Sequence, residues 1–134
     1  MRARTSDATI GSEAQATSLY ELLAPFEALW IEFVFDGSYG SVSRPLGLLA
    51  GRFGRADLAS AHLCAAIDRH AAAAAPALEA RSRADLASAI ERGHADGTPA
   101  EAEALLDRAR QLAQGCGAIR LSDRLARSAV ACER

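Results

Sequence analysis

Glycine and proline divide most of this sequence into segments of about fifteen residues, in which apolar side chains recur every three or four positions. That spacing places the apolar side chains on one face of an α-helix. Alanine, the strongest helix former, fills many of the positions between them. The pattern therefore predicts an all-α fold of antiparallel helices joined by short turns.

Residues at the segment ends predict where the helices begin and stop. A first helix begins after Ser12, which suits an N-cap, and ends before Pro25, because the residue before a proline is driven out of the α region. Pro76 and Pro99 suit first helical turns. We expect the later helices over residues 41–52, 56–70, 76–93, 99–115 and 118–131, and a flexible N-terminus over residues 1–11.

Residues 26–39 are the least regular part of the sequence. They gather most of its aromatic side chains, which are Phe26, Trp30, Phe33, Phe35 and Tyr39. The first half suits a short helix, whereas residues 30–35 alternate as a strand does. Periodicity does not decide between helix and strand in so short an apolar run.

Length and charge bound the kind of protein. A chain of 134 residues fits one domain. Its 15 basic residues, all arginine, and 17 acidic residues give a net charge of −2. Neither nucleic acid nor an anionic membrane surface is therefore expected as the main partner. Because no apolar run approaches the roughly 20 residues of a membrane helix, and no signal peptide is apparent, we expect a cytoplasmic protein.

The paired helices have the spacing of the tetratricopeptide repeat, whose period is about 34 residues. In such a repeat, small residues stand where two helices cross closely, a glycine permits the turn, and larger apolar residues surround the crossing. The residues in these places are Leu46, Gly47, Gly54, Ala59, Leu63 and Ala66. The spacing returns downstream around Leu86, and upstream only as a second half around Ala16 and Tyr20.

This register predicts a short right-handed superhelix of about five to six helices. It forms one domain over residues 12–134, with a half repeat over 12–39, repeats over 40–73 and 76–114, and a capping helix over 118–131. The alternative is an unrelated antiparallel bundle, because small residues in an alanine-rich chain meet such spacings by chance.

A more particular pattern occupies the first half of the chain. It consists of Leu-Tyr-Glu-Leu-Leu-Ala-Pro-Phe at 19–26, Gly-Ser-Val at 40–42, Leu-Gly-Leu-Leu-Ala at 46–50, and Gly-Arg at 54–55 followed by Ala59. In these residues the chain resembles the C-terminal tetratricopeptide-like region of large bacterial ATP-binding regulators. Those regulators include LuxR-type transcriptional activators and fusions of an adenylate cyclase domain with a signalling ATPase. The resemblance covers most of residues 16–115.

The resemblance implies a helical scaffold for autoinhibition or partner sensing, with no catalytic residue to carry over. The sequence departs from such regulators because it lacks a phosphate-binding glycine loop, a cyclase domain and a DNA-binding helix-turn-helix after Arg134. Its residues 30–35 are also bulkier. We expect the regulatory C-terminal part, or a remnant, of a bacterial signalling ATPase or transcriptional regulator.

No combination of residues predicts catalysis or a cofactor. His62 and Cys64 are two positions apart on one helix, so they face different sides. Cys64, Cys116 and Cys132 form no CxxC pair, and we expect reduced thiols, two of them buried among alanines. The histidines show no metal-ligand spacing. We therefore expect no enzyme activity, no cofactor and no metal.

The repeat register predicts a binding groove, because the first helix of each repeat lines the concave face of such arrays. The residues expected there are Arg44, Leu48 and Arg52 from one repeat and Arg81, Ser88 and Arg92 from the next. Guanidinium groups bind carboxylates bidentately. We therefore expect a protein or peptide partner with an acidic segment or a free carboxylate. The alternative is a solvated arginine face.

The half repeat predicts a second surface. A helix over residues 12–24 that lacks a preceding partner leaves an apolar side uncovered, and arrays of this kind need about three repeats or a polar cap. We expect a homodimer, or docking to another domain, through Leu19, Tyr20, Leu23, Trp30 and Phe33. The alternative is that these side chains belong to the core.

Two functions of other classes stay as alternatives. An accessory DNA-binding module would use Arg120, Arg124 and Arg127 of the last helix, although the net acidic charge disfavours it. A small enzyme or ligand-sensing domain would hold a pocket under Trp30.

Overall fold

The computed structural model describes residues 12–34 and 37–132, and it confirms the all-α class for them. The six α-helices of this part are α1 Glu13–Leu23, α2 Ser43–Arg52, α3 Ala56–Ala72, α4 Pro76–Glu91, α5 Pro99–Gly115 and α6 Ile119–Cys132. Every helix expected from the periodicity is present. The flexible N-terminus predicted over residues 1–11 lies outside the described residues.

Side-chain caps explain where two of the helices begin. At the start of α1 the hydroxyl of Ser12 accepts the backbone N–H of Gln15, and the side chain of Gln15 accepts the backbone N–H of Ser12. Thr98 and Glu101 form the same reciprocal pair at the start of α5. Each pair satisfies two N–H groups that a helix start leaves without partners.

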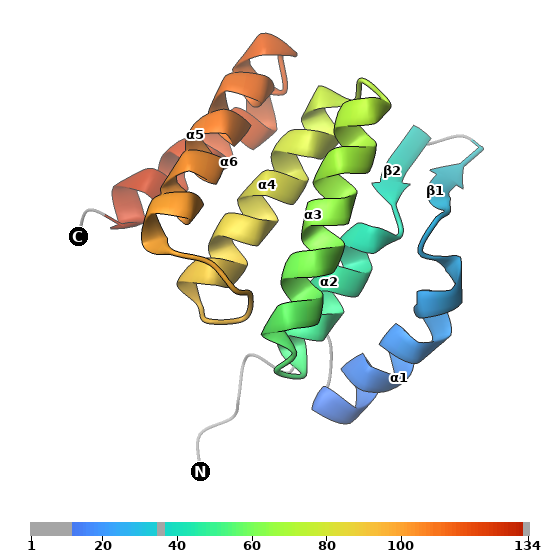
Figure 1. Ribbon diagram of the computed structural model, residues 1–134. Coiled ribbons are helices and arrows are strands. Elements are labelled where there is room, and N and C mark those ends of the chain that lie inside the picture. Colours follow the sequence, from blue (N-terminus) through green and yellow to red (C-terminus); the bar gives the residue numbers. More distant parts are fainter. Residues whose placement is uncertain (1–11, 35–36, 133–134) are drawn as a thin grey trace.

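From α2 onward the helices stack in two layers (Figure 1). Helices α2, α4 and α6 form one layer, in which α4 contacts both of the others. Helices α3 and α5 form the second layer, α3 packing against α2 and α4, and α5 against α4 and α6. Helix α1 lies at one end of the stack, and α5 and α6 form the other end (Figure 1).

Small residues permit the close crossing of α2 and α3, as the repeat pattern predicts. A Cβ at Gly47 would lie 2.6 Å from Cγ of Leu63 and 3.1 Å from its backbone nitrogen. One turn later a Cβ at Gly51 would meet Cβ of Ala59 at 3.8 Å. The turn that follows uses Gly54, whose φ is +82°. The close approach predicted at Gly47 and the turn predicted at Gly54 are therefore confirmed, and Ala59 is fully buried.

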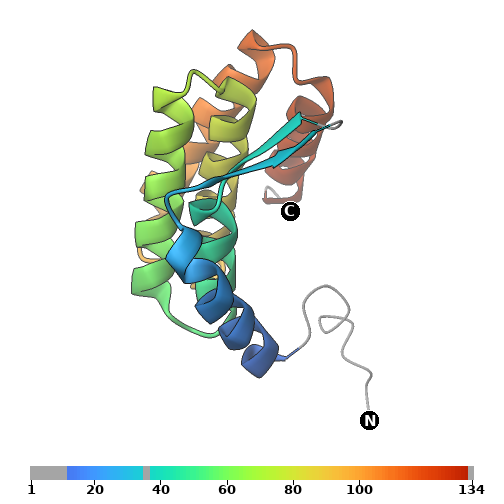
Figure 2. The ribbon, with the colours of Figure 1, turned by 90° about the vertical axis from the view of Figure 1, so that its right-hand side faces the viewer.

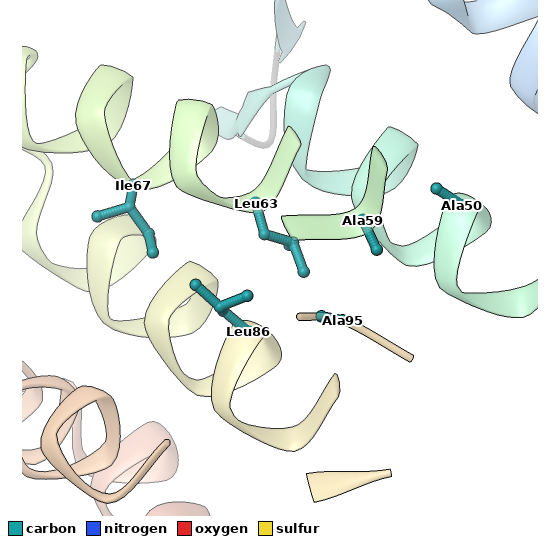
Figure 3. Packing of buried hydrophobic residues seen from close by; sticks show 6 residues of the cluster. All are labelled: Ala50, Ala59, Leu63, Ile67, Leu86 and Ala95. Carbon is teal, nitrogen blue, oxygen red and sulfur yellow. The ribbon is translucent and has the colours of Figure 1, made fainter. Parts of the chain in front are cut away.

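Alanine and a few larger aliphatic residues build the core. Leu63 and Ile67 of α3 approach Leu86 of α4, and the same cluster contains Ala50, Ala59 and Ala95 (Figure 3). A second cluster joins α4, α5 and α6 through Ala80, Ala109, Ala113 and Leu125. Because alanine buries little apolar area, such a core requires helices that lie close together.

Of the described residues in 26–39, only Phe26 lies in a helix, and the strand alternative holds for Trp30–Phe33. A short 3-10 helix, η2 (Ala24–Phe26), continues α1, and two antiparallel strands follow, β1 (Trp30–Phe33) and β2 (Gly37–Ser41). Trp30 pairs with Ser41 and Phe33 with Gly37, with a bulge between Ile31 and Glu32. The hairpin contacts α3 and projects toward the side of the stack on which α6 lies (Figure 2).

Candidate interaction surface

Five of the six residues predicted for the binding groove lie on α2 and α4, which are neighbours in one layer, and the sixth, Arg92, is the C-cap of α4. On each helix these residues are four or seven positions apart, so they form a stripe along one side of the helix. Arg92 is exposed, and the other five are half-buried, namely Arg44, Leu48, Arg52, Arg81 and Ser88. The structure therefore brings the two predicted sets onto adjacent helices.

An ion pair between α2 and α4 shows that the two stripes face each other at one end. Nε of Arg44 lies 2.6 Å from Oδ2 of Asp85, and the two side chains are 22% and 25% exposed. A partly exposed pair contributes about 1 kcal/mol or less to stability, so its main effect is to orient the guanidinium group. Asp85 was not predicted from the sequence, although it follows Arg81 by four residues on the same stripe of α4.

Positive charge accumulates around this pair. Burial lowers the pKa of Arg81, and the charges of Arg44 and Arg124 lower it further, whereas Asp85 and Tyr39 raise it. The guanidinium group of Arg81 thus lies in the field of two further guanidinium groups, those of Arg44 and Arg124, and of the carboxylate of Asp85. An added anion would offset the excess positive charge. We refer to the surface formed by Arg44, Arg81, Asp85 and Arg124 as the arginine face.

A buried histidine ties the hairpin to the helices beside the arginine face. Nε2 of His70 accepts the backbone N–H of Ser41 at 2.9 Å, and Nδ1 lies 3.0 Å from Oγ of Ser82. Because a backbone amide can only donate, Nε2 carries no proton and the neutral ring holds its proton on Nδ1. Burial lowers the pKa of His70, and the charge of Arg44 lowers it further. The ring of Trp30 packs edge-on against this imidazole, with centroids 5.4 Å apart.

A second polar network attaches α1 and η2 to α3. The hydroxyl of Tyr20 lies 2.7 Å from Nε2 of His62, whose Nδ1 lies 3.0 Å from Oε1 of Glu27. Arg69 donates to the backbone carbonyl of Glu27 at 2.6 Å and contacts the hydroxyl of Ser43. The partners of His62 stand 42 and 35 residues away along the chain. The spacing of residues within one helix therefore could not predict these contacts.

The residues predicted for self-association differ in exposure. Leu19 is exposed, whereas Tyr20, Leu23 and Trp30 are half-buried, and the side chain of Phe33 lies outside the described residues. Tyr20 packs edge-on against Phe53, with ring centroids 5.2 Å apart. The other exposed large apolar side chains of α1 and the segment after it were not singled out from the sequence, and they are Leu22, Phe26 and Leu29.

The two cysteines with described side chains are free thiols. The expectation of burial among alanines is wrong for Cys64, which is exposed like Cys116. On α3 the neighbouring Leu63 and Ala66 face the core, so Cys64 falls on the outer side of the helix. Partial burial raises the pKa of Cys64, and the charge of Asp68 raises it further. A raised pKa keeps the thiol protonated and weakly nucleophilic.

Comparisons with protein-family models, with curated proteins and with solved structures found no match to this chain. Among residues 12–34 and 37–132, no helix is long and apolar enough to cross a membrane. The same part of the chain holds no group of three or more His, Cys, Asp or Glu side chains placed to bind a metal. The arginine face is the described feature whose chemistry points most directly to a ligand, because Arg81 is half-buried there and lies in the field of two further arginines, Arg44 and Arg124.

Proposed function

We propose that the chain is a cytoplasmic, non-catalytic protein-interaction domain of the tetratricopeptide type, whose arginine face binds an acidic segment of a partner protein. In this proposal it serves as the regulatory C-terminal part, or a remnant, of a bacterial signalling ATPase or transcriptional regulator. The resemblance in residues 19–59 supports that role. The alternation of helices between two layers supports it further, because stacked helix pairs present one layer as an extended binding surface.

The observation that carries the proposal is the charge around Asp85. Arg44, Arg81 and Arg124 come from three helices of one layer, and Arg44 already pairs with this carboxylate. A carboxylate from a partner would reach Arg81 at a half-buried position, where water screens the interaction less than at an exposed one. A hydrogen bond to a charged group of this kind is worth about 1.5–3 kcal/mol.

The stripes on α2 and α4 favour an acidic segment over a single carboxylate. Arg52 stands two turns after Arg44 on α2, about 12 Å along the helix axis. Arg92, the C-cap of α4, stands three turns after Arg81, with Ser88 between them. An extended peptide of about four residues covers the 12 Å. We therefore expect affinity to rise when acidic residues are spaced along a short segment.

Fluorescence anisotropy with labelled peptides tests the proposal. The probe is a decapeptide of glutamate and leucine, and the reference peptide has lysine at the glutamate positions. The wild-type chain should bind the acidic peptide and not the basic one. Arg81→Glu should weaken binding at least tenfold, since each tenfold corresponds to about 1.4 kcal/mol. Arg44→Glu combined with Arg81→Glu should abolish binding.

A matched control separates the arginine face from net charge. Arg108 is exposed on α5, in the other layer, and donates to Gln111. Arg108→Glu makes the same charge change as Arg81→Glu and should alter the affinity less than twofold. Equal losses in the two variants, or no loss in either, would contradict the proposal. Arg44→Glu also breaks the ion pair between Arg44 and Asp85, which affects folding as well as binding. The exchange Arg44→Asp with Asp85→Arg preserves that pair and therefore separates lost binding from lost folding.

A further inference from the structure

Two guanidinium groups of the arginine face meet one carboxylate between α2 and α4. Nε of Arg44 lies 2.6 Å from Oδ2 of Asp85. Arg81 precedes Asp85 by four residues on α4, so it lies on the same side of that helix. The charges of Arg44 and Asp85 both act on the pKa of Arg81, which is half-buried. The three side chains therefore lie together on one side of the layer.

Helix α6 brings a third guanidinium group to the same place. This helix contacts α4, and Leu125 of α6 packs in one apolar cluster with Ala80 of α4. These two residues are the chain neighbours of Arg124 and Arg81. The charge of Arg124 accordingly lowers the pKa of Arg81. Because Tyr39 of β2 also acts on Arg81, side chains from three other elements surround this guanidinium group.

The arginine face holds a surplus of two positive charges, because its three arginines face one carboxylate, that of Asp85. A carboxylate from a partner carries a single negative charge and leaves one positive charge unmatched. A phosphomonoester carries about 1.5–2 negative charges at pH 7, because its second pKa is about 6, and it offers three acceptor oxygens. A phosphate group therefore matches both the charge and the number of the guanidinium groups.

The other acidic side chains described on these helices do not remove this surplus. Glu79 of α4 pairs with Arg83, whose Nη2 lies 2.8 Å from its Oε1. Glu91 is the last residue of α4 and lies about 9 Å beyond the arginine face along the helix axis. Asp123 is one position before Arg124, about 100° away around α6. Helix α2 contains no acidic residue, and the acidic residues of α5 belong to the other layer.

We propose that the arginine face recognises a phosphorylated serine or threonine in the acidic segment of its partner, with the phosphate between Arg81 and Arg124. The inference rests on the proposed function, since it names the ligand of the same surface. Phosphorylation of the partner then switches binding on, because a serine hydroxyl carries no charge whereas its phosphate carries nearly two. The half-buried position of Arg81 sharpens this difference, because water screens charges less there.

Fluorescence anisotropy with three labelled decapeptides tests the inference. The peptides share one sequence of glutamate and leucine and differ at a central position, which is serine, glutamate or phosphoserine. The phosphoserine peptide should bind at least about tenfold more tightly than the glutamate peptide, since one further charge-assisted hydrogen bond suffices for this factor. Lowering the pH from about 7.5 to about 5.5 should reduce this ratio, because the phosphate takes up a proton near pH 6 whereas glutamate stays ionised.

Single substitutions change the surplus charge in both directions. Arg124→Gln should reduce the ratio of the two affinities to less than about threefold, while binding of the glutamate peptide shows that the variant is folded. Arg108→Gln removes the same charge from an exposed position on α5 and should leave the ratio unchanged. Asp85→Asn keeps an acceptor for Nε of Arg44 and adds one positive charge to the surplus, so it should strengthen binding of the phosphoserine peptide.

The outcomes separate this inference from the proposed function. A glutamate peptide that binds as tightly as the phosphoserine peptide would overturn the inference and leave the proposed function intact. If neither peptide binds, both fall. Binding of the phosphoserine peptide alone would support the inference and contradict recognition of an unphosphorylated acidic segment. Inorganic phosphate that displaces the labelled peptide at the same concentration as unlabelled phosphoserine peptide would overturn the inference, because the arginine face would then bind free phosphate rather than a phosphorylated partner.

Discussion

At the scale of single residues, the hydrogen bonds of His70 determine its protonation state. The amide of Ser41 requires an acceptor at Nε2, so a protonated ring would lose this bond and leave the amide without a partner. Burial and the charge of Arg44 lower the pKa of His70 in the folded chain. In the unfolded chain the pKa is about 6.5. The folded state therefore binds fewer protons than the unfolded state below neutral pH.

This difference predicts how stability depends on pH. A lowered folded-state pKa contributes stability that is complete above about pH 6.5 and is lost as the pH falls toward the folded-state pKa. The free energy of unfolding, measured by urea denaturation, should therefore fall between about pH 7 and pH 5. His70→Gln keeps an acceptor for the Ser41 amide but does not titrate, so the fall should become smaller.

The control for this experiment is His62→Gln. His62 lies in the other polar network, where its ring contacts the hydroxyl of Tyr20 and the carboxylate of Glu27. This variant should keep the loss of stability between pH 7 and 5 that His70 causes. An undiminished pH dependence in His70→Gln would show that another group produces it.

At the scale of elements, the attachment of the hairpin to the helices is the least regular feature of the fold. Two glycines of β2 have nearly the same backbone conformation, with φ of +95° at Gly37 and +94° at Gly40. A Cβ at Gly40 would lie 2.5 Å from Nε2 of His70, whereas a Cβ at Gly37 would meet no atom within 4 Å. The pair therefore separates backbone strain from steric contact.

We expect Gly37→Ala to lower the free energy of unfolding by about 1–2 kcal/mol, the cost of a side chain in the left-handed region. Gly40→Ala should add a steric cost of about 1–3 kcal/mol, because its methyl group displaces His70 from the Ser41 amide. Urea denaturation at neutral pH measures both variants. Equal losses at the two positions would mean that the contact with His70 does not hold the hairpin.

The elements also show what the sequence could predict and why. The helices were predictable because periodicity, proline and capping residues such as Ser12 act within one or two turns. The hairpin was not, because Trp30 to Phe35 is too short for periodicity to separate helix from strand. Asp85 shares its stripe with Arg81, yet only the fold shows that Arg44 reaches it from α2. The partners of His62 likewise come from distant segments, which no local pattern specifies.

At the scale of the whole molecule, the two-layer stack assigns different chemistry to different surfaces. One layer gathers the arginine face from α2, α4 and α6, and the α1–η2 segment exposes large apolar side chains at one end of the stack (Figure 1). The alanine-rich core explains how so short a chain holds these surfaces together, because small side chains bring successive helices close.

The most direct test of the central claim is a map of the acidic peptide on the chain by ¹⁵N-edited NMR. Titration with the glutamate–leucine decapeptide should shift the backbone amides of residues 44–52 on α2 and 81–92 on α4. Amides of α5 around Arg108 should stay unchanged. Shifts confined to α5 or to α1, with residues 44–52 and 81–92 unaffected at saturating peptide, would contradict the account.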